Sequence, residues 1–265
     1  MSTPSVTVCV LTYGDHHELA FRCLTSIARA CPELAAGGVR VGLNDVGDRT
    51  VKYVDSLVQH AWLKPENVWR SATNIHKYPM MRRMFYDTQN PLTTEYVMWF
   101  DDDSFIKDEM IGVRPTFLTQ VVQAMEAAAK EVVLCGSVYN IDWAAGQREW
   151  VQDQPWYRGR ALPKKPTFCT GGWWMARTDA LRHLDYPWPS LDHRGGDVML
   201  GQALFQQGQR FLQYRKGVAI NADAEGRESK AERRGFNQSP IGCGYVRTVK
   251  TTPAARRTLI DMLDL

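Results

Sequence analysis

Strand-like and helix-like segments alternate over the first hundred residues, and this order constrains the fold more than any other feature. Apolar segments of strand length lie at 5–12, 39–43, 66–70 and 96–100. The segments between them place apolar residues at helical spacing, as the first one does. Because crossover helices of this kind join parallel strands, the sequence predicts an α/β fold with a mostly parallel sheet covered on both faces.

The second half of the chain is less regular. A helix is predicted over 116–130, a strand over 131–139, a helix over 196–208 that ends at Gly208, and a last strand over 211–220. Between 143 and 170 the sequence is rich in aromatic residues and proline without regular alternation, and we expect a β-hairpin and loops over the edge of the sheet. No internal repeat divides the chain, so one domain is expected.

Three carboxylates follow the fourth strand-like segment in the stretch YVMWFDDDS, residues 96–104. Ligands of open parallel sheets bind outside the carboxyl ends of the strands, so Asp101, Asp102 and Asp103 fall where a site is expected. Adjacent carboxylates repel unless a cation or several donors compensate their charge. In an extended chain Asp101 and Asp103 point the same way and Asp102 the opposite way. Asp101 and Asp103 are therefore predicted to hold one Mg²⁺ or Mn²⁺ ion, since these cations prefer oxygen ligands.

The residues next to the triplet decide between its other interpretations. A solvated loop, or a helix N-cap at Asp103 or Ser104, explains an isolated triplet about as well and stays open. A calcium loop fails because Ile106 stands where the sharp turn needs glycine. An aspartyl phosphatase would place its Asp after the first strand and continue with Gly-Thr, whereas Ser104 and Phe105 follow here.

Four segments, in consistent order over roughly residues 5–220, resemble the family 2-like glycosyltransferases of the GT-A fold. They are SVTVCVLTYGDHHELAFRCLTSI, YVMWFDDDS, TGGWWMARTDALRHL and GGDVMLGQALFQQGQRFLQY. The resemblance implies a GT-A-like, Rossmann-type, mostly parallel sheet flanked by helices, with a small mixed β subdomain for the acceptor. It also implies a nucleotide-binding half over 1–110, an acceptor-binding half over 111–220, and a basic C-terminal loop and tail over 221–265.

The activity implied by the resemblance is metal-dependent transfer of a sugar from a nucleotide-diphosphate sugar, a UDP-sugar by preference, to an acceptor hydroxyl with inversion. Asp101 and Asp103 then hold Mn²⁺ or Mg²⁺, which neutralises the leaving diphosphate. Asp197 is implied as the general base that deprotonates the acceptor. The family usually has Glu before this Asp, whereas Gly196 stands here. Asp197 also suits the N-cap of the following helix, and one residue can serve both purposes.

The resemblance implies a further set of residues that hold the donor. In chain order they are Thr12, Tyr13, Asn44, Asp45, Lys77, Arg82, Asp102, Gly172, Trp173 and Trp174. The resemblance implies that the first four contact the base. The two basic side chains are implied to contact the base or the diphosphate, and Asp102 the sugar or a local hydrogen-bond donor. For the two basic residues, a solvated helix start is an equally good interpretation.

Trp173 and Trp174 are candidates for stacking on a sugar or a base. Because neighbouring strand positions face opposite ways, only one of them is expected to line a site, and the other to lie in the core. Many family members carry a metal-binding His near the C-terminus, but the stretch AEGRESKAERRGFNQ, residues 224–238, contains none. A basic lid that orders over the diphosphate and a solvated charged loop both remain open for this stretch.

Two rival functions remain open. A nucleotidyltransferase acting on sugar phosphates shares the sheet and the metal carboxylates, although no glycine-rich phosphate loop follows the first strand. A non-catalytic nucleotide- or carbohydrate-binding module is the second. The acceptor is open between a polysaccharide, a protein and a modified base in nucleic acid. A polyanion stays a minority hypothesis, because residues 206–265 hold 11 Lys or Arg against 6 Asp or Glu.

Apolar runs and cysteines in the sequence indicate where the protein is located. No apolar run reaches the roughly 18 residues of a transmembrane helix, and the N-terminus lacks the pattern of a signal peptide. The six cysteines are scattered and form neither a CxxC pair nor a zinc pattern. We therefore expect a cytoplasmic protein with reduced thiols and no transmembrane segment.

Overall fold

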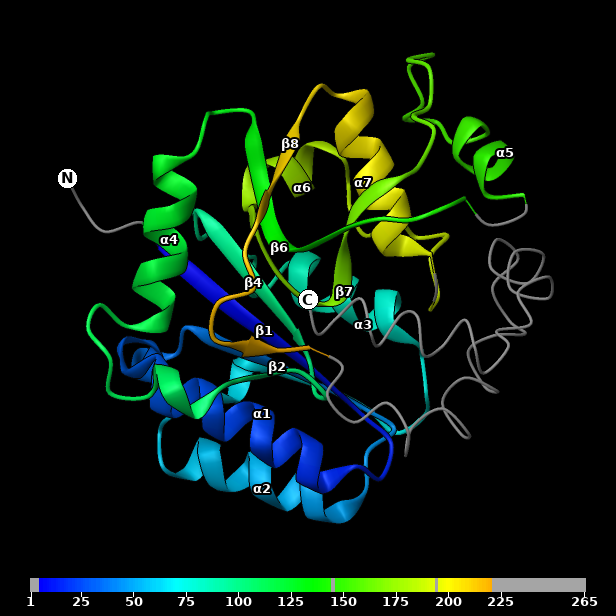
Figure 1. The fold of residues 1–265 in the computed structure, drawn as a ribbon. Helices are drawn as coiled ribbons and strands as arrows, with labels where there is room; N and C mark the ends of the chain where they lie inside the picture. The colour runs from blue at the N-terminus through cyan, green and yellow to red at the C-terminus, as the bar shows by residue number, and fades with distance from the viewer. Residues whose placement is uncertain (1–4, 144–145, 194, 221–265) are drawn as a thin grey trace, which may run out of the picture.

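The computed structural model describes residues 5–143, 146–193 and 195–220, which form a seven-stranded sheet flanked by helices (Figure 1). The strand order is β3-β2-β1-β4-β7-β6-β8. β7 is antiparallel to both of its neighbours, and the other pairs in this sheet are parallel. The strands are β1 Val6–Tyr13, β2 Val39–Asn44, β3 Val68–Ser71, β4 Tyr96–Asp101, β6 Val132–Asn140, β7 Thr167–Arg177 and β8 Arg210–Gln213. The predicted α/β fold with a mostly parallel sheet is confirmed.

Helices cover both faces of the sheet. They are α1 His17–Ala30, α2 Asp48–Gln59, α3 Lys77–Tyr86, α4 Phe117–Ala127, α5 Gln147–Gln152, α6 Thr178–His183 and α7 Gly196–Gln206. Alternate residues of β1 enter two separate cores: Val8 and Val10 lie in one, and Cys9 and Leu11 in the other. Side chains of α1, α2 and α4 complete the first core, and those of α3, α6 and α7 the second. Figure 1 shows α1 and α2 on one side of the sheet and α6 and α7 on the other.

The β-hairpin predicted within 143–170 is wrong for the part of this segment that the structure describes. The segment instead forms α5 and a loop that leads into β7. The backbone N–H of Arg160 donates to Oε1 of Gln206 (3.0 Å), which fastens the loop to the end of α7. Trp156 stacks on Trp188, with ring centroids 5.5 Å apart. The aromatic residues of this segment pack individually against other parts of the chain, and this is why they do not alternate as strand residues would.

The last predicted strand, 211–220, is divided in two by a turn. β8 ends at Gln213, and β9 Val218–Ala219 pairs antiparallel with β5 Phe105–Ile106, which follows the acidic triplet. Gly217 has φ of 74°, a left-handed conformation that ends an extended segment. The small second sheet is therefore a two-stranded antiparallel one, and it brings the chain after β8 back to the segment that follows the triplet.

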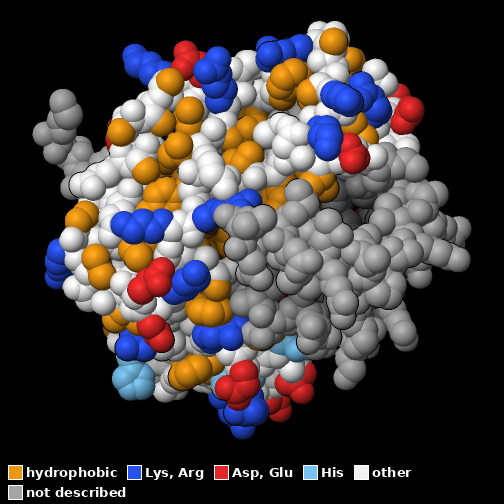
Figure 2. Space-filling model, in the orientation of Figure 1, with side chains coloured by type: hydrophobic (Ala, Val, Ile, Leu, Met, Phe, Trp, Pro, Cys, Tyr) orange, Lys and Arg blue, Asp and Glu red, His pale blue; other side chains and the backbone are white. Residues whose placement is uncertain are grey.

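Several sequence expectations concern the whole chain. In the ranges that the structure describes, no helix is both long and apolar enough to cross a membrane. The cysteines in these ranges are free thiols, and all of them are buried, as expected for reduced core residues; they are Cys9, Cys23, Cys31, Cys135 and Cys169. On the face shown in Figure 2, Lys and Arg side chains lie spread among apolar and acidic ones rather than gathered in one patch. The predicted basic loop and tail, 221–265, lie outside the described residues.

α7 packs closely on β7 at Gly201. A Cβ at this position would lie 2.5 Å from the carbonyl oxygen of Thr167 and 2.7 Å from Cβ of Phe168. Neither atom is the end of a flexible side chain, so α7 would have to move. Replacing Gly201 by Val is therefore expected to lower the free energy of unfolding by roughly 1–3 kcal/mol, measured by urea denaturation. An unchanged free energy would show that α7 shifts on β7 without cost.

Candidate active site

The chain turns directly after β4, and the turn carries Asp102 and Asp103. The N–H of Ser104 donates to the carbonyl oxygen of Asp101 (2.9 Å), which closes the turn. The Asp102 carboxylate accepts from the N–H of Tyr13 (3.0 Å), and its own N–H donates to a carbonyl oxygen of β1 (3.1 Å). The predicted extended triplet is therefore wrong, because bonds to β1 hold Asp102 in a turn. Strand alternation does not place Asp101 and Asp103 on a common face.

Asp101 is held from two directions. Its Oδ2 accepts from Nζ of Lys77 (2.6 Å), and its Oδ1 accepts from Nε1 of Trp99 (2.9 Å). The Lys77 ammonium also donates to the carbonyl oxygen of Gly171 (2.8 Å). The two charged side chains are mostly buried, 11% exposed for Lys77 and 21% for Asp101. Lys77 therefore joins α3 to the end of β4 and to β7 through charge-assisted hydrogen bonds.

The loop before α3 is fixed by the end of β2. His76, directly before Lys77, has φ of 70° and ψ of 172°, a conformation that is almost restricted to glycine. Its N–H donates to Oδ1 of Asn74 (2.8 Å), which also accepts from Nδ2 of Asn44 (3.0 Å). Asn44 is buried, so its side chain positions this loop, and through it the first turn of α3.

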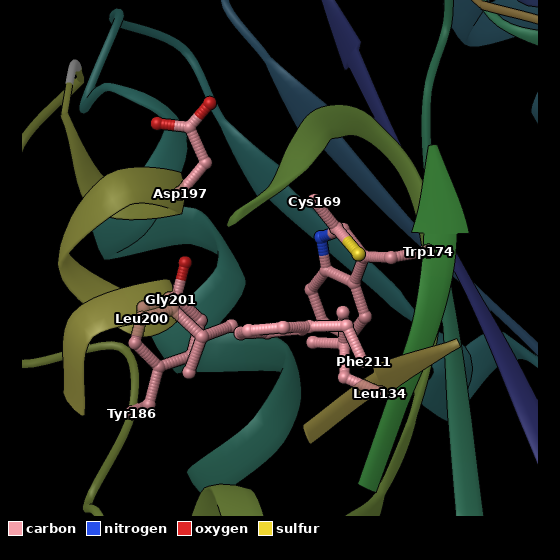
Figure 3. Close-up of a pocket in the computed structure, with 8 residues that line it drawn as sticks. All are labelled: Leu134, Cys169, Trp174, Tyr186, Asp197, Leu200, Gly201 and Phe211. Atoms are coloured by element: carbon pink, nitrogen blue, oxygen red, sulfur yellow. The ribbon is translucent and has the colours of Figure 1, made fainter. Parts of the chain in front are cut away.

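Asp197 lies in the first turn of α7, close to Lys77. Its Oδ1 accepts from the N–H of Val198 (2.9 Å). A Cβ at Gly171 would lie 3.1 Å from Nζ of Lys77 and 4.0 Å from Oδ2 of Asp197, so the bare backbone of Gly171 lets both charged groups approach. Burial raises the pKa of Asp197, and the Val198 N–H and the Lys77 charge oppose this rise. Figure 3 shows the Asp197 carboxylate directed away from the apolar side chains of the small pocket between α7 and β7.

The raised pKa of Asp197 has a consequence for stability. A group whose pKa is raised on folding stabilises the protein below its unfolded pKa, near 3.8 here, and this contribution is lost as pH rises through the folded pKa. Asn stays neutral at every pH. Asp197→Asn is therefore expected to raise Tm at about pH 7, and the gain should vanish towards about pH 3. Thermal melts across this range measure it; a lower Tm at neutral pH would show that the bonds of the carboxylate outweigh its burial.

The glycine that precedes Asp197 is explained by Tyr78. A Cβ at Gly196 would lie 2.2 Å from Cζ of Tyr78, so no residue with a side chain fits beside this ring. Tyr78 is buried and packs edge-on against Tyr186, with ring centroids 6.1 Å apart. Burial raises the pKa of both phenols well above their usual value, and the Asp197 charge adds to the rise. Asp197 therefore has two phenol hydroxyl groups as neighbours, and their raised pKa keeps them protonated.

The candidate donor residues of β1 and β2 meet at the carboxyl edge of the sheet, as predicted. Tyr13 is in register with Asn44, and Leu11 with Asp101. Asp45 follows β2 with φ of 57° and is partly exposed. Thr12 is different: it is fully buried, and its hydroxyl donates to a carbonyl oxygen of β2 (3.0 Å). The Thr12 side chain holds β1 to β2, and its complete burial leaves no surface for a contact with a base.

Arg82 lies apart from these residues. Its Nη1 donates to the carbonyl oxygen of Pro187 (2.7 Å) and to Oδ1 of Asp185 (3.0 Å), and its guanidinium lies over the ring of Tyr86. The predicted contact of Arg82 with a base or diphosphate is therefore replaced by a structural contact. Lys77 and Arg82 are more than one helical turn apart on α3, which separates their surroundings.

The two neighbouring tryptophans of β7 are both core residues. Trp173 is fully buried and packs against Phe100 and Phe117. Trp174 is 3% exposed and stacks on Trp99, with ring centroids 6.2 Å apart. They face opposite sides of the sheet as expected, but helices cover both sides. The prediction that one of them offers a stacking surface to a ligand is corrected by this burial. Gly172, also predicted at the donor, is buried in the same strand.

The triplet provides hard oxygen donors of the kind that Mg²⁺ and Mn²⁺ bind. Within the described ranges, no group of three or more His, Cys, Asp or Glu could hold a metal ion by itself. Mg²⁺ commonly takes one or two carboxylates from a protein and further oxygen ligands from the phosphates of a nucleotide. Asp103 is 8% exposed, and Asp101 is the carboxylate that Lys77 contacts. The carboxylate oxygens of the triplet are therefore suitable ligands for such a cation, and Asp101 is at the same time bonded to the Lys77 ammonium.

Three contributors to the site were missed in the sequence. Trp99 stands two residues before Asp101, and strand alternation would have placed both side chains on one face. Tyr78 and Gly171 gave no comparable signal, because their contacts with Gly196, Lys77 and Asp197 join residues far apart in the chain.

Known proteins resemble this chain in structure but not in sequence. No protein-family model matches the sequence, and no curated protein matches it either. The mannosyltransferase PcManGT from Pyrobaculum calidifontis, in complex with GDP-Man and Mn²⁺, superposes with a TM-score of 0.55 at 15% identity, covering 95% of this chain and 67% of that chain. S. aureus TarS 1-349 superposes with a TM-score of 0.51 at 14% identity, covering 79% of this chain and 58% of that chain. GalNAc-T7 with UDP, GalNAc and Mn²⁺ superposes with a TM-score of 0.53 at 11% identity, covering 84% of this chain and 43% of that chain.

These neighbours define the class of fold. The protein has the GT-A-like fold of glycosyltransferases, with the mostly parallel sheet, flanking helices and small second sheet described above. At identities of 11–15% the likeness concerns the fold alone. The chain spans between 43% and 67% of the length of these three chains.

Proposed function

We propose that the protein is a metal-dependent glycosyltransferase that moves a sugar from a nucleotide-diphosphate sugar, a UDP-sugar by preference, to an acceptor hydroxyl with inversion. The observation that carries this proposal is the meeting of Asp197 with the Lys77–Asp101 pair across the bare backbone of Gly171. It brings a candidate base next to the acidic triplet at the carboxyl edge of a GT-A-like sheet. The neighbours in complex with GDP-Man and Mn²⁺, and with UDP, GalNAc and Mn²⁺, support the donor class.

The proposed division of labour follows the chain. Residues 1–110 hold the nucleotide, and residues 111–220 hold the acceptor. Tyr13 and Asp45 are the proposed contacts of the base, because they are partly exposed at the carboxyl ends of β1 and β2. The acceptor class stays open between a polysaccharide, a protein and a modified base in nucleic acid.

In the proposed mechanism the residues of this chain divide three tasks. Asp103 and Asp101 would hold Mn²⁺ or Mg²⁺, which as a Lewis acid neutralises the leaving diphosphate. Asp197 accepts the proton of the acceptor hydroxyl at its carboxylate as the hydroxyl attacks, and its raised pKa strengthens it as a base. Lys77 keeps the region between the two carboxylates from being purely negative. Tyr78 excludes water on the inner side of Asp197, because its buried ring packs against Gly196.

A donor screen tests this function. UDP-, GDP- and other nucleotide-sugars are incubated with the protein, with and without Mn²⁺, and the release of nucleoside diphosphate is measured. Mn²⁺-dependent release of a nucleoside diphosphate, followed by a mass increase of one sugar on an acceptor, is the expected result. Release of pyrophosphate from a nucleotide and a sugar phosphate would identify a nucleotidyltransferase instead. Nucleotide binding without turnover and without metal dependence would identify a binding module.

A further inference from the structure

The ion pair between Lys77 and Asp101 lies where the proposed function requires a divalent cation. We propose that the Lys77 ammonium and the divalent cation compete for the Asp101 carboxylate. The cation then binds weakly to the protein alone, and tightly only together with a nucleoside diphosphate. This inference rests on the proposed function and adds an order of binding to it.

The geometry fixes Lys77 on Asp101. One carboxylate oxygen accepts from Nζ at 2.6 Å and the other from the Trp99 indole at 2.9 Å. The carbonyl oxygen of Gly171 holds the same ammonium from β7 at 2.8 Å. With 11% of the Lys77 side chain exposed, water screens this charge poorly. A divalent cation that approaches Asp101 therefore meets a fixed positive charge within a few ångströms, and the two repel each other.

A nucleoside diphosphate removes the conflict. Its anionic oxygens ligate the cation, and they also accept hydrogen bonds from an ammonium group. Lys77 then has a second anionic partner, and the Asp101 carboxylate becomes available to the cation. The alternative, that Lys77 is only a structural strut, predicts no change in cation affinity when its charge is removed.

Mn²⁺ titrations of the full chain, followed by electron paramagnetic resonance, test the competition. Without nucleotide, Lys77→Met is expected to bind Mn²⁺ at least about tenfold more tightly than the wild type, because the competing charge is gone. Lys77→Arg keeps the charge and is expected to stay within about threefold of the wild type. With saturating UDP or GDP, the difference between Lys77→Met and the wild type should shrink, since the diphosphate serves both cations.

Lys130→Met is the matched control for net charge. Lys130 is exposed and precedes β6. Leu134 near the start of β6 pairs with Ala176 of β7, and Ala176 also pairs with Val97 near the start of β4. It therefore lies at the end of the sheet opposite Asp101, and its removal is expected to leave Mn²⁺ affinity unchanged. Circular dichroism melts check folding, and Lys77→Gln replaces Lys77→Met if the latter does not fold.

Two results would overturn the competition. In the first, Lys77→Met, or Lys77→Gln, binds Mn²⁺ no more tightly than the wild type. In the second, Lys130→Met gains as much Mn²⁺ affinity as the Lys77 variant. Failure of the proposed function looks different: neither the wild type nor any variant binds Mn²⁺ in the presence of UDP or GDP, and the donor screen shows no release of nucleoside diphosphate. That result removes the competition together with the metal site.

Discussion

Asp197→Asn is expected to lower kcat for sugar transfer by roughly 10²–10⁴-fold and to leave the donor dissociation constant within about twofold. The variant keeps the size and the hydrogen-bond acceptor of the side chain but removes the group that takes the acceptor proton. Because Asp197 begins α7 and its carboxylate accepts from the N–H of Val198 within that helix, donor binding is not expected to depend on its charge. Acceptor-dependent release of nucleoside diphosphate and calorimetric donor binding measure the two quantities.

Asp179→Asn is the matched control. Asp179 occupies the first turn of α6, and its Oδ1 accepts from the N–H of Ala180 (2.7 Å), as Oδ1 of Asp197 does from Val198. Its helix follows the end of β7 that pairs with the start of β4, away from the triplet. The control should keep full activity. If both variants lose activity together, or if Asp197→Asn loses donor binding, then Asp197 is a structural residue of its helix.

Asp103→Ala is expected to abolish Mn²⁺-dependent transfer, with a loss of at least about 10²-fold, and to remove the response of donor hydrolysis to Mn²⁺. The reason is that Asp103 belongs to the turn that presents the acidic triplet, and a small site of one or two carboxylates does not tolerate the loss of one. Turnover is measured over a range of Mn²⁺ concentrations.

Asp108→Ala serves as the control for the triplet. Asp108 is a few residues downstream, its side chain is 93% exposed, and it forms an ion pair with Arg29 at 3.9 Å. Its replacement is expected to leave the Mn²⁺ response intact. Turnover that is unchanged in Asp103→Ala would place the metal elsewhere and remove the triplet from the site.

The order of elements made much of the fold predictable. Alternating strands and helices gave the parallel sheet, and the carboxyl ends of β1, β2 and β4 gave the edge where Tyr13, Asn44 and Asp101 meet. Such predictions succeed because they depend on strand direction alone, and direction follows from the crossovers.

Side-chain partners were much less predictable. Trp173 and Trp174 face opposite sides of the sheet, as their spacing requires, but whether a face is open depends on helices that lie far from β7 in the chain, such as α4 over Trp173. The turn after Asp101 is held by a hydrogen bond from the N–H of Tyr13 to Asp102. The position of the Arg82 side chain is set by its bond to Pro187, in a loop about a hundred residues away. A single sequence does not show which distant residues come into contact. Some residues that it predicts to be functional therefore only support the fold.

The backbone at His76 gives the first turn of α3 an added meaning. A non-glycine residue with φ of 70° and ψ of 172° costs of the order of 1–3 kcal/mol, and it persists only where the surroundings impose it. Directly after it, Lys77 contacts Asp101 and Tyr78 packs beside Asp197. Both candidate carboxylates thus depend on the orientation of one helical turn, and the strain sets that orientation. Stability is given up at a single residue, and the end of β4 and the start of α7, which are far apart in the chain, both contact the same helical turn.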